Sequence, residues 1–288
     1  MLNLNGSGVA LITPFLENGD INYKKLEELI LYHIVNKTDF LVPCGTTGES
    51  STLSNEEKKE MIKFVVEKTN KKLPVIAGTG SNNTKIAIEM SKYAKDIGAD
   101  GVLVVTPYYN KCNSLGLYNH YKKIAEAIYP LPLILYNVPS RTCVDIPIDI
   151  VVELSKISNI IGIKEANTSL SRISEIIQKT HKNFKVFSGN DDLTLPILAL
   201  GGNGVISVAA NIIPDKMHYL VKNNDINIHN KYFQLMQALF LDVNPIMIKE
   251  AMNILGYNVG NTRLPLDNTK NENIEILKQI LKEKIDEI

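Results

Sequence analysis

The chain has 288 residues, of which 44% are hydrophobic and 22% are charged, and its 31 basic and 31 acidic residues give a formal net charge of zero. The length suits an α/β barrel of about 250 residues with a short additional segment. The charge balance argues against a protein dedicated to nucleic acid or to an anionic membrane surface, and every apolar run is too short to span a bilayer.

The cysteines and the N-terminus indicate the compartment. Three cysteines, Cys44, Cys112 and Cys143, show no Cys-x-x-Cys pairing, and a sparse, odd set is typical of a reducing compartment without a disulfide framework. The first residues lack a basic stretch followed by a long apolar run, so they do not form a secretory signal. We therefore expect a cytoplasmic protein.

Short apolar runs alternate with longer amphipathic segments along most of the chain. The runs are nearly continuous in Val, Ile and Leu, which is typical of parallel strands that are buried on both faces. The expected strands are Val9–Phe15, Phe40–Cys44, Pro74–Ala77, Gly101–Thr106, Leu131–Val138, Ile160–Ile163, Phe184–Phe187 and Gly204–Val208.

The segments between these runs carry apolar side chains at helical spacing. In one of them Ser54 and Glu57 have the spacing of a capping box, which predicts that a helix begins after Ser54. The expected helices of this region are Tyr23–Asn36, the helix after Ser54, Lys85–Ile97, Leu117–Ile128, Ile148–Lys156, Ser171–Lys179, Asp192–Leu200 and Pro214–Lys222.

Eight strands that are each followed by a helix predict an α/β protein with the (β/α)8 TIM-barrel fold. An open doubly wound sheet is the alternative, but no Gly-x-Gly-x-x-Gly fingerprint follows the first strand. The alternation ends near Asn223, and three helical patterns follow it: His229–Phe240, Pro245–Leu255 and Asn271–Lys284. We expect residues 1–224 to form the catalytic barrel and residues 225–288 a C-terminal helical domain, with the Asn-rich stretch 223–227 as the seam.

Catalytic side chains of such barrels lie at the carboxyl ends of the strands, and hydroxyl groups, one lysine and one arginine gather there. Lys164 follows the buried run Ile160–Ile163, so its amine is withdrawn from water, which favours the neutral form that attacks ketones. A lysine paired with Glu165 or another carboxylate is the structural alternative. The neighbouring strand-end residues favour catalysis and predict a Schiff base with a small 2-oxo acid. The histidines lie away from the strand ends, so no metal triad is expected.

Four further side chains complete the expected site. Tyr136 ends the neighbouring strand, where a phenol either passes protons or caps the barrel core. Thr47 lies between glycines, and its hydroxyl serves either a proton relay or a turn. Tyr109 extends the relay, whereas Tyr108 points elsewhere and is assigned to packing or an interface. Arg141 has the planar fork that binds a substrate carboxylate, although loop carbonyls are the alternative partners.

Four segments carry a resemblance to a known family. They are Gly45–Glu49, Tyr108–Asn110, Tyr136–Thr142 and Gly162–Ala166. In sequence and order they closely resemble the dihydrodipicolinate synthase family, and the similarity extends over essentially the whole chain. The wider superfamily includes N-acetylneuraminate lyase and sugar-acid aldolases, all of them pyruvate-type class I aldolases.

The resemblance implies that Lys164 forms a Schiff base with pyruvate. It assigns Tyr136, Thr47 and Tyr109 to the proton relay, with Tyr109 entering from a neighbouring subunit. It also assigns Arg141 to the carboxylate of L-aspartate 4-semialdehyde. The implied product is 4-hydroxy-tetrahydrodipicolinate, which leads to diaminopimelate and lysine.

The remaining implications concern substrate placement and assembly. Thr46 and the backbone at Gly189 and Ile206 help to place the substrate. The family needs neither an organic cofactor nor a catalytic metal, and its usual assembly is a homotetramer built as a dimer of dimers. Two alternatives stay open: a sibling aldolase that acts on a 2-oxo sugar acid or N-acetylneuraminate, against which Arg141 argues, and a non-catalytic binding barrel, which would lack part of the relay.

The resemblance also bears on feedback inhibition by lysine. Lysine-sensitive members bind lysine with histidines after the glycine loop and with an acid on the next helix. Those positions read Asn55, Lys58 and Ile86 here. A cation near the effector's ammonium repels it, and an apolar side chain leaves the second ammonium unpaired. We therefore expect no lysine inhibition.

Overall fold

Eight short parallel strands and the helices between them make up the computed structural model, which describes residues 4–285. The strands are β1 (Gly6–Ala10), β2 (Phe40–Val42), β3 (Ile76–Gly78), β4 (Gly101–Val105), β5 (Leu133–Asn137), β6 (Ile160–Glu165), β7 (Lys185–Ser188) and β8 (Gly204–Ser207). The helices are α1 (Tyr23–Val35), α2 (Asn55–Thr69), α3 (Thr84–Asp96), α4 (Ser114–Ile128), α5 (Pro139–Thr142), α6 (Ile148–Ser155), α7 (Leu170–Lys179), α8 (Thr194–Ala199), α9 (Pro214–Asn223), α10 (Ile226–Ala238), α11 (Ile246–Ile254) and α12 (Asn271–Ile285), with 3-10 turns η1 (Asp191–Leu193) and η2 (Ala209–Asn211).

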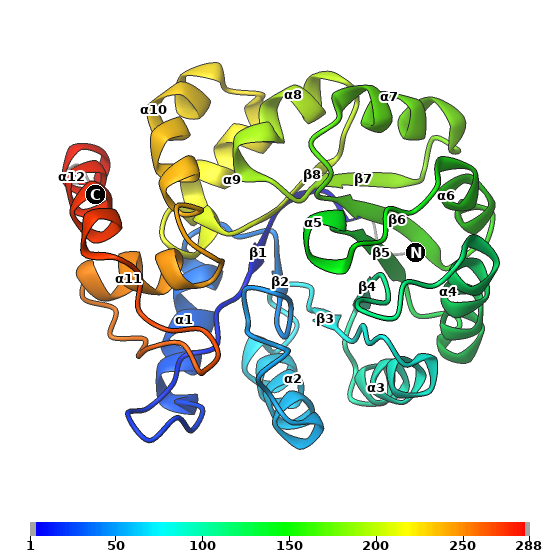
Figure 1. Ribbon diagram of the computed structural model, residues 1–288, viewed down its shortest axis with the longest axis horizontal. Coiled ribbons are helices and arrows are strands. Elements are labelled where there is room, and N and C mark those ends of the chain that lie inside the picture. The colour runs from blue at the N-terminus through cyan, green and yellow to red at the C-terminus, as the bar shows by residue number, and fades with distance from the viewer. Residues whose placement is uncertain (1–3, 286–288) are drawn as a thin grey trace.

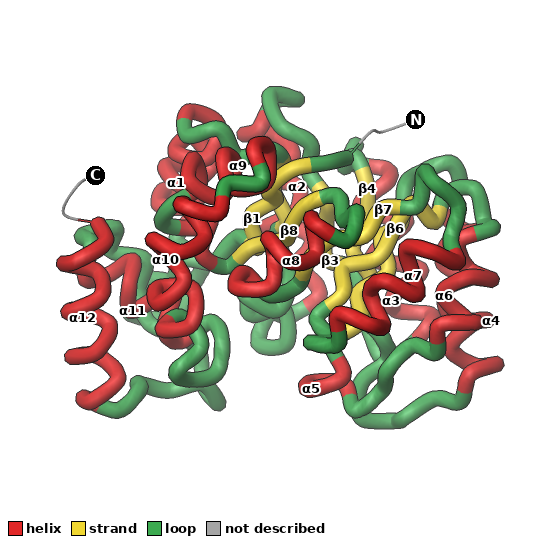
Figure 2. Tube along the Cα trace, turned by 90° about the horizontal axis from the view of Figure 1, so that it is seen from above, coloured by secondary structure: helices red, strands yellow, loops and turns green. Residues whose placement is uncertain are grey.

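The strands follow one another around a ring in the order β2-β1-β8-β7-β6-β5-β4-β3. A parallel bridge between Leu41 and Val75 and a hydrogen bond of 2.9 Å from the Leu41 N–H to the Pro74 carbonyl bring the two ends of this series together. The helices surround the ring, and α10, α11 and α12 gather at one side of it (Figures 1 and 2). The (β/α)8 barrel expected from the alternating pattern is confirmed.

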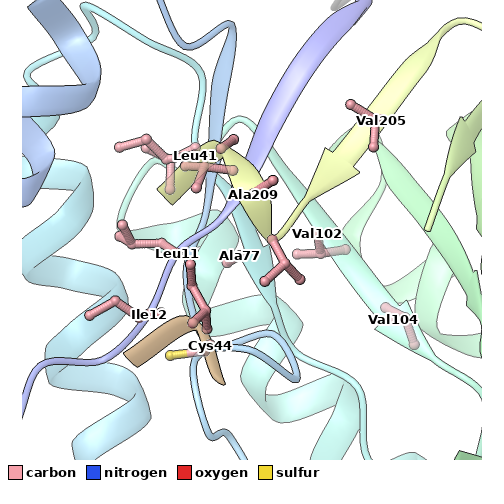
Figure 3. Close-up of a cluster of buried hydrophobic side chains, with 14 of the residues drawn as sticks. Leu11, Ile12, Leu41, Cys44, Ala77, Val102, Val104, Val205 and Ala209 are labelled. Atoms are coloured by element: carbon pink, nitrogen blue, oxygen red, sulfur yellow. The ribbon is translucent and has the colours of Figure 1, made fainter. Parts of the chain in front are cut away.

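Two apolar regions follow from the alternation of side chains along each strand. Inside the barrel, one buried cluster comprises Leu4, Ala10, Phe40, Val42, Ile76, Leu103, Ile134, Tyr136, Val138, Ile161, Phe187 and Ile206. The larger cluster lies between strands and helices, and Figure 3 shows part of it, including Leu41 of β2, Val102 of β4 and Val205 of β8. Strands with apolar groups on both faces explain why the runs in the sequence are continuous.

Several element boundaries differ from expectation. The first strand is Gly6–Ala10 rather than Val9–Phe15, because the later part of that apolar run leaves the sheet, and the Phe15 N–H bonds the Val259 carbonyl of the C-terminal segment. The loop expected around Arg141 contains the short helix α5, which begins at Pro139, where a missing N–H costs no helical hydrogen bond. Strand β6 extends to Glu165, so Lys164 lies within the strand rather than after it.

The seam between the two expected domains is shorter than the Asn-rich stretch indicated. Helix α9 ends at Asn223 and α10 begins at Ile226, where the Asp225 carboxylate accepts hydrogen bonds from the backbone N–H groups of Asn227 and Ile228 at 2.8 and 3.1 Å. Helix α10 packs against α9, η1 and α12. The division at residue 224 falls in the turn before α10 and stays a prediction.

Within residues 4–285, no helix combines the length and the apolar character that crossing a bilayer requires.

Two buried histidines make the stability of the folded protein depend on pH. His33 of α1 contacts the Thr38 hydroxyl at 2.9 Å, and His120 of α4 contacts the Thr84 hydroxyl at 2.9 Å. Burial lowers the pKa of His33 to about 3 and the pKa of His120 to about 4, from the ordinary value of 6.5. Both rings therefore stay neutral in the folded protein at pH values where the unfolded chain binds protons.

We expect the free energy of unfolding to fall as the pH drops below 6.5. The unfolded state takes up a proton at each histidine from pH 6.5 downward, and the folded state does so only near pH 3 to 4. Each histidine then removes about 1.4 kcal/mol per pH unit once its unfolded form is protonated. Urea unfolding at pH 7 and pH 5, at one protein concentration, measures the effect. A variant with His33→Gln and His120→Gln should lose less stability over this interval than the wild type; an equal loss would contradict the assignment.

Candidate active site

Lys164 lies inside the barrel. In β6 its register partners are Tyr136 of β5 and Phe187 of β7, and its Nζ lies 4.5 Å from the centroid of the Tyr136 ring. Its side chain is only 5% exposed. The neighbours Ile163 and Glu165 face the surrounding helices, so the alternation of the strand directs Lys164 into the lumen.

Glu165 does not pair with the Lys164 amine. Its carboxylate lies 3.1 Å from Nε of Arg172 on α7 and accepts hydrogen bonds from the Asn137 side chain at 2.7 Å and from the Asn167 N–H at 2.9 Å. Within the described part of the chain, no carboxylate forms an ion pair with Lys164. The structural alternative, a lysine kept for a salt bridge with Glu165, is therefore not what the protein contains.

Asp191 is a buried carboxylate near Lys164 that the sequence did not single out. It accepts hydrogen bonds from the backbone N–H groups of Val208 and Ala209 at 3.1 and 2.9 Å, just beyond β8. Burial raises its pKa, against hydrogen bonds from Ser207 and these two N–H groups and against the charge of Lys164. Asp191 thus fixes the end of β8 and adds a negative group to the surroundings of the amine. Asp191 lies two residues after the glycine that follows β7, and this place at the carboxyl end of a strand is the sequence feature that could have identified it.

Thr47 and Arg141 meet through a residue from the C-terminal segment. The Asn244 side chain donates from Nδ2 to the Thr47 hydroxyl at 3.0 Å, and the Asn244 carbonyl accepts from Arg141 Nη2 at 3.1 Å. Both Thr47 and Asn244 are buried. Asn244 is 197 positions from Thr47 in the chain, and no local sequence pattern indicates this contact.

A cavity of about 280 Å³ opens beside these residues. Its wall includes Thr46, Arg141, Asn244, Tyr108 and Lys58. Two valines of the wall, at positions 105 and 138, also pack with the lumen cluster that contains Tyr136, so the cavity adjoins the region of the lysine. Two cations on the wall suit a carboxylate ligand.

The two adjacent tyrosines after β4 differ in position. Tyr108 lines the cavity, whose wall includes none of Lys164, Tyr136 and Thr47, so its assignment to packing or an interface stays a prediction. Tyr109 has a left-handed backbone, with φ of 73°, and its side chain is 91% exposed. Within this one chain Tyr109 does not join Lys164 and Tyr136.

The two positions expected to place substrate through their backbone lie at the same end of the barrel. The Gly189 N–H donates to the Glu165 carbonyl at 2.7 Å, so its own carbonyl is the group that remains for a ligand. A Cβ at Gly189 would lie 2.7 Å from the Ala166 Cβ, which only glycine avoids. Ile206 pairs with Gly8 of β1 and belongs to the lumen cluster.

A buried ion pair holds the loop that carries Thr46 and Thr47. The Glu49 carboxylate lies 2.6 Å from the Lys249 amine of α11 and accepts from the Arg263 N–H at 2.9 Å. Both cations also contact the Phe15 ring, with Lys249 Nζ at 4.1 Å and Arg263 Cζ at 4.4 Å from its centroid. Burial lowers the pKa of Lys249 to about 8, although the charge of Glu49 opposes the shift. The C-terminal segment therefore fixes the glycine loop.

The Cys44 thiol and the possible metal ligands of residues 4–285 form no further reactive site. Burial raises the pKa of the Cys44 thiol to about 12, which suits the small core residue expected from the sequence rather than a nucleophile. Among residues 4–285, no three His, Cys, Asp or Glu side chains are grouped so as to hold a metal ion.

Comparison with known proteins gives one consistent match. The model of the Dihydrodipicolinate synthetase family matches residues 3–284. A protein of Acetivibrio thermocellus named 4-hydroxy-tetrahydrodipicolinate synthase is 52% identical over 285 residues, covering 96% of both chains. A dihydrodipicolinate synthase structure from Aquifex aeolicus is 44% identical, with a TM-score of 0.94 and coverage of 97% of both chains. A structure of the enzyme from Cyanidioschyzon merolae, described with lysine bound, is 37% identical, with a TM-score of 0.95 and coverage of 97% of this chain and 98% of that one.

Proposed function

This chain belongs to the dihydrodipicolinate synthetase family, and we propose that it carries out the family's condensation through a Schiff base on Lys164. Its activity is that of a 4-hydroxy-tetrahydrodipicolinate synthase, a lyase that joins pyruvate to L-aspartate 4-semialdehyde on the route to diaminopimelate and lysine. The observation that carries the proposal is a buried amine in the barrel lumen, 4.5 Å from a tyrosine ring and without a carboxylate partner among residues 4–285.

The chemistry begins at the ketone of pyruvate. The neutral Lys164 amine attacks the carbonyl carbon, and the carbinolamine loses water to give an iminium ion. Loss of a methyl proton converts the iminium ion into an enamine, whose carbon attacks the aldehyde and forms the new carbon–carbon bond. The amino group of the adduct then displaces Lys164 as the ring closes. Tyr136 is next to the amine and is placed to carry protons in these steps.

Thr47 and Tyr109 extend this proton relay, with Tyr109 supplied by a neighbouring subunit. Two observations support a shared site: Tyr109 is 91% exposed on its own chain, and it does not line the cavity that Tyr108 lines. A tyrosine held in a left-handed backbone conformation and directed into solvent is suited to fill another copy's cavity. The proposed assembly is a homotetramer built as a dimer of dimers.

Arg141 binds the carboxylate of L-aspartate 4-semialdehyde, and Thr46 and the backbone at Gly189 and Ile206 place the substrates. The Arg141 guanidinium uses one N–H for the Asn244 carbonyl, which leaves further donors for a ligand. Arg141 and Thr46 share the cavity wall. Since the relatives reported above are synthases, the aldolase that cleaves a sugar acid is not adopted.

Lysine does not regulate this enzyme. Asn55, Lys58 and Ile86 line one cavity of about 220 Å³ that also reaches Tyr108. Lys58 is half-buried, and no carboxylate of the described chain pairs with it. A bound lysine would bring its side-chain ammonium near this cation, and Ile86 offers no counter-charge to the second ammonium. A loss of about 3 kcal/mol weakens binding by more than about 100-fold.

The Schiff base is tested by reductive trapping. Borohydride added with pyruvate should attach a reduced pyruvyl group to Lys164, since only an imine is trapped, and mass spectrometry of the digest locates it. Lys164→Ala should lose the adduct and nearly all condensation activity. Labelling of a different lysine, or a wild-type protein that cannot condense the two substrates, would remove the proposed function.

The role of Arg141 is tested by separate Michaelis constants. Arg141→Ala should raise the KM for L-aspartate 4-semialdehyde by roughly 30-fold to 900-fold, which corresponds to about 2–4 kcal/mol for a carboxylate partner. The KM for pyruvate should change little. Arg141→Lys keeps the charge without the fork and should fall between the two. Equal effects on both substrates would mean that Arg141 only supports its loop.

Lysine sensitivity is tested by titration in the same assay, with calorimetry alongside. The wild type should not reach half-inhibition below about 1 mM lysine, given the weakening of more than about 100-fold. A variant with Lys58→Ala and Ile86→Glu removes the repulsive cation and supplies an acid, so it should bind lysine more tightly than the wild type. Half-inhibition of the wild type at lower concentration would show that other residues replace the missing contacts.

A further inference from the structure

Asn244 belongs to the connection between α10 and α11. Its side-chain amide and its backbone carbonyl each form a hydrogen bond with a residue of the proposed site. Its amide Nδ2 donates to the Thr47 hydroxyl, and its backbone carbonyl accepts from Arg141. It is 6% exposed and forms part of the cavity wall. We propose that Asn244 is a positioning residue that sets the direction in which the Thr47 hydroxyl passes its proton, an inference that rests on the proposed function.

The direction follows from the donors and acceptors of a hydroxyl group. Thr47 has one O–H donor and two lone pairs. The Asn244 amide N–H occupies one lone pair and, having no lone pair to offer, leaves the Thr47 proton free. The hydroxyl can then receive a proton at its second lone pair and give its own to the next group of the relay. An acceptor in the place of Nδ2 would instead capture that proton and stop the transfer.

The other amide atom indicates that this side chain is not kept for stability. Oδ1 of Asn244 is buried and has no hydrogen-bond partner among residues 4–285. Leaving such an acceptor unpaired destabilises the folded protein, and an apolar side chain at this position would avoid that penalty. An asparagine at this position therefore lowers stability and provides the hydrogen bond to Thr47 in return.

The two contacts of Asn244 are separable by mutation. The bond to Arg141 uses the backbone carbonyl, which every substitution retains, whereas the bond to Thr47 uses the side chain alone. Asn244→Ala therefore removes the orientation of the hydroxyl and keeps the support of the guanidinium. This predicts a change in kcat without a matching change in the KM for L-aspartate 4-semialdehyde.

Steady-state kinetics and the rate of borohydride trapping test the proposal. Asn244→Ala should lower kcat and the rate of Schiff-base formation by about 10-fold to 100-fold, part of what proton transfer contributes, and should change the KM for L-aspartate 4-semialdehyde by less than about threefold, well below the change expected for loss of a buried polar partner. Asn244→Asp keeps the size but can only accept, so it should be at least as slow. In a Thr47→Val background, Asn244→Ala should have no further effect, because both changes remove one interaction.

Asn253→Ala is the matched control. Asn253 lies on α11, and its side-chain amide donates to the Gly260 carbonyl at 3.1 Å and accepts from the Val259 N–H at 2.8 Å, without contact to a site residue. It should keep the wild-type kcat. If the wild type condenses its substrates and labels Lys164, but Asn244→Ala is no slower than Asn253→Ala or adds fully to Thr47→Val, the inference is overturned and the proposed function stands. Should Asn244→Ala fail to fold, Asn244→Asp decides: wild-type kcat in that variant overturns the proposal.

Discussion

Each strand of a closed parallel barrel serves two regions at once, because successive side chains point into the lumen and out to the helices. Strand β6 shows what this constraint produces. Ile163 packs against the surrounding helices, and Glu165 pairs with Arg172 outside the barrel. The side chain of Lys164, which lies between them in the strand, therefore points into the lumen. The alternation that fills the lumen with apolar side chains therefore also places the amine among them. The two-residue repeat of side-chain direction along the strand therefore determines both the packing of the barrel and the position of the proposed nucleophile.

Patterns that repeat within a short stretch of chain were predictable. The barrel, the capping box at Ser54 and the buried strand that leads to Lys164 all follow from local spacing, and all are present, although β6 extends to Glu165. The end of β1 was misplaced because the residues up to Phe15 are apolar for a different reason: they lie under the C-terminal segment. The Asn244 contact with Thr47 joins positions 197 residues apart, and no local pattern encodes such a meeting.

The charged side chains around the proposed site fall into two groups that differ in burial and in partners. Lys249 is almost fully buried, and the carboxylate of Glu49 compensates its charge at 2.6 Å. Lys58 and Arg141 lie on the wall of the cavity, and neither has a carboxylate partner within the described chain. A cation in a buried ion pair holds its surrounding structure in place, whereas a cation without a carboxylate partner on a cavity wall is suited to bind an anionic ligand. This contrast separates Lys249, which holds the glycine loop, from Lys58 and Arg141, whose charges face the cavity.

The late position of Asn244 and Lys249 has a consequence for synthesis. A nascent chain that has left the ribosome as far as α9 already contains all eight strands and Lys164. It still lacks the amide that orients Thr47 and the cation that neutralises Glu49. Since chains emerge N-terminus first, a polypeptide still being translated carries the nucleophile but not the completed relay. Until its last quarter has been made and docked, the barrel therefore lacks two contacts of the proposed site, the Asn244 amide on Thr47 and the Lys249 amine on Glu49.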